Sequence, residues 1–131
     1  MIQSIAMFPV LVVSDLGRVK AFYETHFGFV ADFFQEDFYL HLRQPDSHAQ
    51  LAFMVPNHPS QPGFLQRPAS VDGMVISLEV KVSKDAHEKA REAGMEMVLD
   101  YREEEFGVAH FMVKDPSGLV IDIVEHLPQE A

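Results

Sequence analysis

The first half of the chain alternates between strand-like and helix-like patterns. An apolar run over residues 5–13 predicts a strand, and apolar residues at helical spacing predict a helix over 16–28. Ser14 and Asp15 offer an N-cap to this helix, and Gly28 supplies its end. Three further strands are predicted at 29–35, 37–43 and 49–55. The first half is therefore expected to fold in the order β-α-β-β-β.

The second half repeats this order. Residues 74–82 predict a strand, Ser83 offers a cap to a helix over 84–93, and Gly94 ends that helix. Strands are predicted again near 95–101, 107–114 and 119–126. The two helix-ending glycines lie 66 residues apart in a chain of 131 residues. A repeat at half of the chain length indicates two βαβββ modules in one chain.

A connector separates the two halves. Residues 56–73 contain four prolines and two glycines, and loops of this length are often functional or contact a partner. We predict a single domain over 1–131, in which module one covers 1–55, the connector covers 56–73 and module two covers 74–131.

Composition narrows the class of function. The chain has no cysteine, which excludes disulfides, zinc–thiolate sites, iron–sulfur clusters and thiol nucleophiles. Twenty acidic against ten basic residues give a net charge of -10, so nucleic acid and anionic membranes are poor partners, whereas neutral or cationic ligands remain open. No apolar run approaches the ~20 residues that span a bilayer, and the N-terminus lacks the basic region of a signal peptide. We expect a cytoplasmic protein.

Two stretches carry a resemblance to a known family. The residues VLVVSDLGRVKAFYETHFGF at 10–29 and GVAHFMVKDPSGLVIDIVEH at 107–126 resemble hallmarks of the vicinal oxygen chelate superfamily. That group contains glyoxalase I, extradiol dioxygenases, fosfomycin resistance proteins and bleomycin resistance proteins. The resemblance implies an α+β fold in which two βαβββ modules form a cup-shaped mixed β-sheet with helices on the convex side. It also implies a ligand in the cup and a homodimer.

The resemblance further assigns four metal positions. Family enzymes take one ligand of a divalent metal from the first strand and one from the last strand of each module. Matched residue by residue, these positions are Phe8 and Gln50 in module one and Val75 and Asp122 in module two. Phenylalanine and valine have no donor atom, so we predict no metal ligands and no cofactor in this chain. A divalent metal is the alternative.

Strand alternation predicts which side chains line the cup. The expected ligand-binding residues are Phe8, Val10, Tyr39, His41, Gln50, Val75, Ser77, His110, Met112 and Asp122. His41 and His110 are either ligand contacts or half-exposed strand residues. The other histidines are expected to be solvated, namely His26, His48, His58, His87 and His126. The acidic segment REEEFG at 102–107 is expected to be a solvated turn, or else to attract a cationic ligand.

Three functions are consistent with these residues. The leading hypothesis is a metal-free small-molecule-binding protein of the bleomycin resistance type, which sequesters an aromatic or cationic ligand in an apolar cup. The first alternative is a metal-dependent lyase, isomerase or dioxygenase of the glyoxalase type, with donors from His41, Gln50, His110 and Asp122. The second is a non-catalytic interaction module with a vestigial cup. No catalytic residue is assigned, although Glu79, His110 and Asp122 are the candidates for proton transfer.

Overall fold

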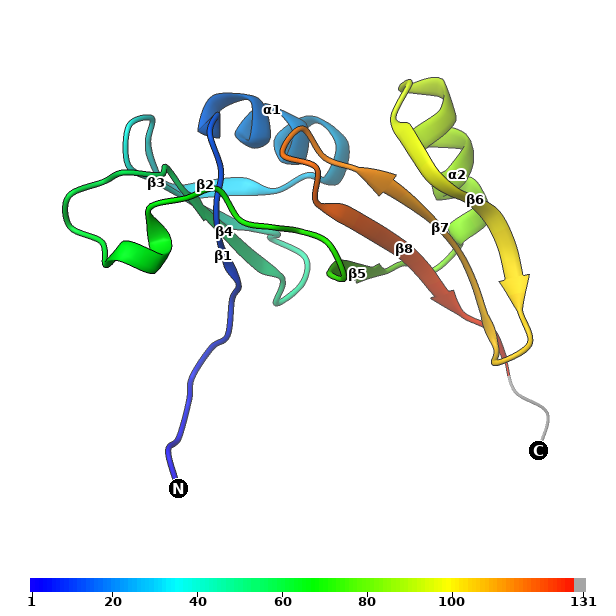
Figure 1. Ribbon diagram of the computed structural model, residues 1–131. Coiled ribbons are helices and arrows are strands. Elements are labelled where there is room, and N and C mark those ends of the chain that lie inside the picture. The colour runs from blue at the N-terminus through cyan, green and yellow to red at the C-terminus, as the bar shows by residue number, and fades with distance from the viewer. Residues whose placement is uncertain (129–131) are drawn as a thin grey trace. The chain divides into compact units, whose positions relative to one another are not determined.

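The structure, a computed structural model, describes residues 1–128 and forms two compact units (Figure 1). The first unit is Met1–Ser70, and the second begins at Val71. The elements of the first unit are β1 (Val10–Val12), α1 (Leu16–Phe27), β2 (Val30–Gln35), β3 (Tyr39–Arg43), β4 (Gln50–Met54) and a 3-10 helix at Gly63–Leu65. Those of the second unit are β5 (Val75–Glu79), α2 (Ser83–Glu92), β6 (Glu96–Glu104), β7 (Val108–Lys114) and β8 (Val120–His126). The predicted α+β fold with two βαβββ modules is confirmed.

Both units build the same mixed sheet. The strand order is β1-β4-β3-β2 in the first unit and β5-β8-β7-β6 in the second. In each unit the first and last strands pair in parallel, while the remaining pairs are antiparallel. The first and last strands of each module are therefore neighbours, which is the arrangement that places residues from both on one surface. The common cup stays a prediction.

Helix α1 forms where the sequence predicts it. The Asp15 side chain accepts a hydrogen bond from the backbone N–H of Arg18 at 3.1 Å, and Gly28 ends the helix with a left-handed φ of 67°. The helix buries Tyr23 against Phe53 of β4, with ring centroids 5.7 Å apart. Removing a large aromatic side chain from water contributes roughly 2–3 kcal/mol.

Helix α2 begins differently from the prediction. Ser83 is its first residue rather than its cap, and Val82 at the cap position offers no side-chain hydrogen bond. The carboxylate of Glu125 on β8 takes over this role, since its Oε1 accepts from the Ser83 backbone N–H at 2.9 Å and from the Ser83 hydroxyl at 3.2 Å. The first turn of α2 is thus capped by the last strand of its own module. Gly94, with a φ of 71°, follows the helix as expected.

Two strand boundaries were predicted wrongly. The apolar run over 5–13 yields only the three-residue strand β1, because regular pairing with β4 begins at Val10. At the other extreme, β6 continues through the acidic segment as far as Glu104, and only residues 105–107 form the turn. Among the described residues, no helix is both long enough and apolar enough to cross a membrane.

Candidate functional site

Each sheet has a helix face and an opposite face, here called the open face. In the first unit Leu40, Leu42 and Phe53 lie on the helix face and are fully buried. One row across the open face joins Val10 to Ala52, Ala52 to His41 and His41 to Phe33. The predicted alternation therefore places Val10, Tyr39, His41 and Gln50 on the same side of the sheet, as the sequence suggested.

A chain of hydrogen bonds runs along the open face of the first unit. The Tyr39 hydroxyl lies 3.3 Å from His41 Nδ1, and His41 Nε2 lies 2.7 Å from the Gln50 side-chain oxygen. An amide oxygen only accepts, so Nε2 carries the proton, and in the neutral ring Nδ1 accepts from Tyr39. These hydrogen bonds hold the three side chains in one orientation. Burial also raises the pKa of the Tyr39 phenol.

Aromatic rings surround this chain. The Phe8 ring meets the His41 ring edge-on at 4.5 Å between centroids, and 39% of the Phe8 residue remains exposed. Tyr39 in turn contacts Phe33 at 6.1 Å and Phe38 at 5.9 Å. The predicted site residues of module one therefore lie together. We call the rings of Phe8, Phe33, Tyr39 and His41 the aromatic face.

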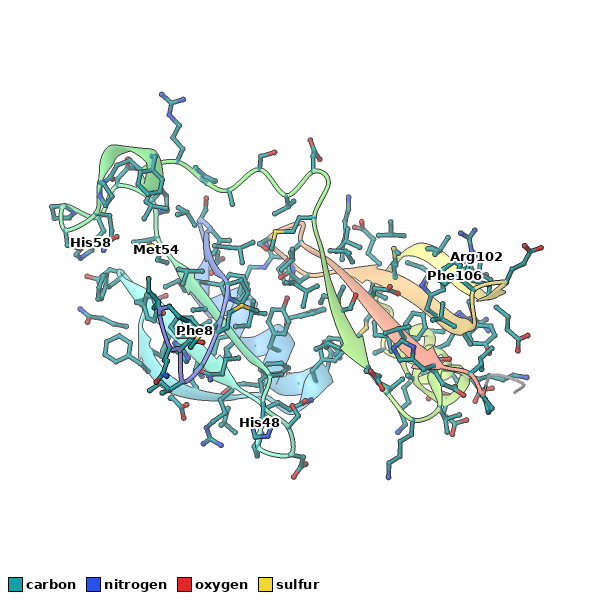
Figure 2. All side chains as sticks on the ribbon, turned by 90° about the horizontal axis from the view of Figure 1, so that it is seen from below. Phe8, His48, Met54, His58, Arg102 and Phe106 are labelled. Carbon is teal, nitrogen blue, oxygen red and sulfur yellow. The ribbon has the colours of Figure 1, made fainter. Side chains whose placement is uncertain are left out.

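The aromatic face continues toward the connector at one end. His58 packs on Phe38 with ring centroids 4.3 Å apart, and its Nδ1 bonds the Ser60 hydroxyl at 2.7 Å. His58 is therefore half-buried rather than fully solvated, because stacking on Phe38 covers part of its ring. Figure 2 shows His58 and His48 toward opposite ends of the first unit, with Phe8 between them.

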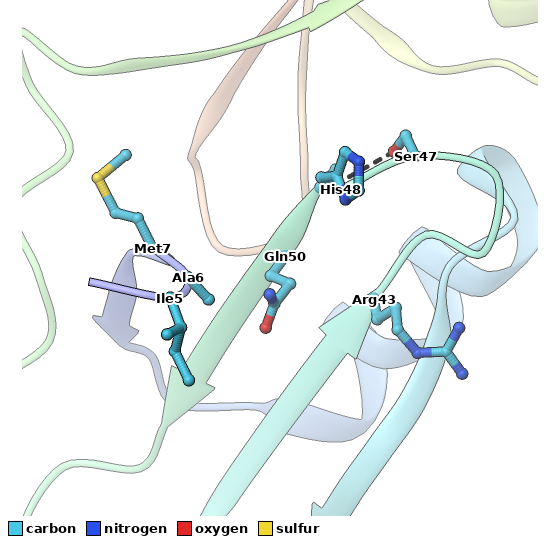
Figure 3. Close-up of a pocket in the computed structure, with 8 residues that line it drawn as sticks. Ile5, Ala6, Met7, Arg43, Ser47, His48 and Gln50 are labelled. Atoms are coloured by element: carbon cyan, nitrogen blue, oxygen red, sulfur yellow. Dashed lines mark hydrogen bonds between the residues drawn. The ribbon is translucent and has the colours of Figure 1, made fainter. Parts of the chain in front are cut away.

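A hollow lies at the other end of the aromatic face (Figure 3). Its volume is about 290 Å³. Strand residues Arg43 and Gln50, which are cross-strand partners, form one part of the wall, and Ile5 and Met7 from the segment before β1 form another. The lining is completed by Ala6, Ser47, His48 and Ala49. Polar donors and apolar side chains therefore meet in this hollow.

The open face of the second unit carries a different set of residues. Ser77 pairs with Asp122, and Asp122 pairs with Met112, so the three lie in one row. Val75 lies on the same face one pair away, opposite Val120. The predicted residues of module two are thus brought onto one surface.

The centre of this surface is an imidazole held between two carboxylates. His110 Nδ1 lies 2.8 Å from Asp122 Oδ1, and His110 Nε2 lies 2.8 Å from Glu104 Oε2. Only 6% of His110 is exposed. Because carboxylate oxygens accept, two such contacts are satisfied when the imidazole carries both protons. Burial opposes the charged ring, but the hydrogen bonds to Glu104 and Asp122 prevail and raise the pKa of His110.

Glu104 is the member of this cluster that the sequence did not reveal. Its Oε2 also accepts from Arg102 Nε at 2.8 Å, and the hydrogen bonds from His110 and Arg102 lower the pKa of Glu104. The acidic segment is therefore part of the strand face rather than only a solvated turn. If the sequence is read as a hairpin with its turn at 105–107, Glu104 comes to lie near His110 on the same face of the sheet. The run of three glutamates instead led to the prediction of a loop.

The structure also corrects the expectation for His87. Its side chain is only 13% exposed, because the ring packs between α2 and the sheet and contacts Phe111 at 5.2 Å. Its Nε2 lies 2.7 Å from Asp100, whose pKa is lowered by the backbone N–H of Tyr101 and then by His87. This pair lies on the helix side of the sheet, away from the open face.

The residues at the family's metal positions do not fit a four-ligand metal site. Phe8 and Val75 supply no donor atom. The remaining donors are engaged, since Gln50 accepts from His41 and Asp122 accepts from His110. Within residues 1–128 no group of three or more acidic or histidine side chains is placed to hold a metal ion.

The fold places the chain among α+β proteins built from two βαβββ modules, each of which carries polar residues on the open face of its sheet. The chain matches the family model described as the Glyoxalase/Bleomycin resistance protein/Dioxygenase superfamily over residues 2–123, and it belongs to that superfamily. No curated protein matches the chain.

Solved structures agree on the fold. A member of the same superfamily from Sphaerobacter thermophilus DSM 20745 is 21% identical, with a TM-score of 0.74 and coverage of 95% of this chain and 98% of the other. A lactoylglutathione lyase from Agrobacterium tumefaciens is 16% identical, with a TM-score of 0.74 and coverage of 94% of each chain. A glyoxalase/bleomycin resistance protein/dioxygenase from Nocardioides is 16% identical, with a TM-score of 0.75 and coverage of 100% and 91%.

Proposed function

We propose that this chain is a metal-independent binding protein that holds a flat organic molecule against the aromatic face of its first module. The observation that carries the proposal is the aromatic face itself, where Phe8 replaces a metal ligand and packs on His41. Stacking on such rings stabilises a flat ligand by about 0.5–1.5 kcal/mol per ring pair beyond simple burial. A few fixed polar groups, here Tyr39, His41 and Gln50, would orient it.

Two further parts of the proposal rest on the resemblance and on composition. We infer a homodimer, in which a second copy completes the ligand site, because most members of the family work as dimers. We also infer a cytoplasmic location, which suits a chain without cysteine. Native mass spectrometry of freshly purified protein tests the dimer and reports any ligand that is retained.

A neutral fluorescent probe tests the binding function. The chain has no tryptophan, so the emission of 2-naphthamide can be followed with little interference from the protein. Phe8→Ala should weaken its binding by about tenfold, which corresponds to ~1.4 kcal/mol. Phe106→Ala is the matched control, since Phe106 is 74% exposed on the β6–β7 turn of the other unit. Equal loss in both variants, or saturable binding that ignores Phe8, would contradict the proposal.

A further inference from the structure

We propose that the ligand carries a carboxylate group, which binds in the hollow at the Gln50 end of the aromatic face. The inference rests on the proposed function and specifies the chemical class of the ligand. Arg43 and Gln50 both line the hollow, and each carries hydrogen-bond donors without a partner within residues 1–128. The first unit has six acidic and four basic residues, a net charge of only -2, so it does not strongly repel an anion.

The first donor is the side-chain nitrogen of Gln50. The Gln50 oxygen is already used as the acceptor for His41 Nε2 at 2.7 Å. With the amide oxygen turned to His41, the NH₂ group is left for another partner, and it forms no hydrogen bond within residues 1–128. Gln50 lines the hollow. The chain from Tyr39 through His41 therefore ends in two free N–H donors.

The second donor group is the guanidinium of Arg43. Its Nε lies 3.0 Å and 3.1 Å from the two carboxylate oxygens of Asp32. This ion pair uses one nitrogen and leaves both terminal nitrogens without a partner in the described part of the chain. Arg43 stands directly opposite Gln50 in the β3–β4 pairing, so the two lie at the same end of the face. Arginine binds carboxylates through two parallel hydrogen bonds more readily than any other side chain.

The distribution of charge favours this interpretation over a cationic ligand. Residues 1–70 contain six acidic and four basic residues, whereas residues 71–131 contain 14 acidic and six basic residues. Eight of the ten net negative charges therefore belong to the second unit. The net charge of the whole chain favoured a cationic ligand. Most of that charge, however, lies outside the unit that carries the aromatic face.

The rest of the hollow suits the apolar part of such a ligand. Ile5 and Met7 are almost fully exposed side chains that border the hollow, and the aromatic face continues from Gln50 to His41 and Phe8. The volume of about 290 Å³ is close to the lower limit of ~300 Å³ for small-molecule sites. An aromatic carboxylate matches both the donor pair and the rings beside it.

Three naphthalene probes test the inference. We would compare the affinities of 2-naphthoate, 2-naphthamide and 2-naphthylmethylammonium by their fluorescence. We expect 2-naphthoate to bind about tenfold more tightly than the amide, because only the carboxylate forms an ion pair with the guanidinium. Gln50→Glu keeps an oxygen for His41 but replaces the free donors by a negative charge, so it should remove the preference for 2-naphthoate. Arg43→Met should do the same.

The controls separate this inference from the proposed function. Arg18→Met removes an equal charge from the exposed side of α1 and should leave all three affinities unchanged. Equal affinity for 2-naphthoate and 2-naphthamide would overturn the carboxylate inference and leave the proposed function standing. Tighter binding of the ammonium probe would also overturn it. Failure of all three probes to bind would overturn both.

Discussion

The Asp122 carboxylate offers a quantitative test of the cluster in the second module. Asp122→Asn keeps an oxygen for His110 Nδ1 but removes the negative charge. A hydrogen bond to a charged group contributes about 1.5–3 kcal/mol, against about 1 kcal/mol for a neutral one. Since His110 is only 6% exposed, we expect Asp122→Asn to lower the free energy of unfolding by about 1–2 kcal/mol at pH 6. For a chain of this length the Tm falls by roughly 3–8 °C.

The loss should depend on pH in a defined direction. The folded-state pKa of His110 is raised above its ordinary value of 6.5 by the carboxylates. Its stabilising effect is therefore complete below the unfolded pKa and is lost as the pH rises through the folded-state pKa. Hence Asp122→Asn should cost more at pH 6 than at pH 9, because a larger share of the wild-type imidazole is neutral at the higher pH.

Urea unfolding followed by far-UV circular dichroism at both pH values is the measurement. Asp72→Asn is the control, because Asp72 is exposed and lies outside the strands. A cost that is the same at pH 6 and pH 9 would refute the role of the imidazolium and leave only a packing effect. No cost at pH 6 would refute the hydrogen bond itself.

Three further predictions concern metal content and the helix ends. Elemental analysis of freshly purified protein should find well below one divalent metal ion per chain, and a stoichiometric metal would contradict the assignment of Phe8 as part of an organic site. Glu125→Ala should lower the free energy of unfolding by about 1 kcal/mol, since it removes the hydrogen bonds that cap α2 at Ser83. Glu125→Gln keeps an acceptor oxygen and should cost less, so equal losses of stability in the two variants would argue against a cap. Gly28→Ala should cost about 1 kcal/mol because of its positive φ, whereas Gly63→Ala should be close to neutral, and calorimetry that ranks them in reverse would contradict this.

Local patterns were sufficient to predict the modules. Asp15 caps the start of α1 and Gly28 ends it, both as the sequence predicted and in the structure. These signals could be recognised because both act within a few residues of the helix. Alternation also placed Tyr39, His41 and Asp122 on the correct faces, since the side-chain period of a strand is fixed. These features need no knowledge of the rest of the chain.

The missed features depend on contacts between distant residues. Ser83 looks like a cap in the sequence, but the carboxylate that performs this task comes from 42 residues further on. The glutamates at 103–105 suggested a loop because charged runs favour turns, yet pairing with β7 extends β6 to Glu104. For the apolar run over 5–13 the predicted strand was too long rather than too short. A strand needs a pairing partner as well as a favourable propensity.

The parallel pairing of first and last strands has a consequence for folding. Val10 on β1 pairs with Ala52 on β4, 42 residues away, and Ser77 on β5 pairs with Asp122 on β8, 45 residues away. The closure entropies of the two loops are therefore almost equal, because this cost grows only with the logarithm of loop length. Neither sheet is complete until its final strand has been synthesised. Since no strand of the first sheet comes from the second module, the first module can close while the ribosome is still making the second.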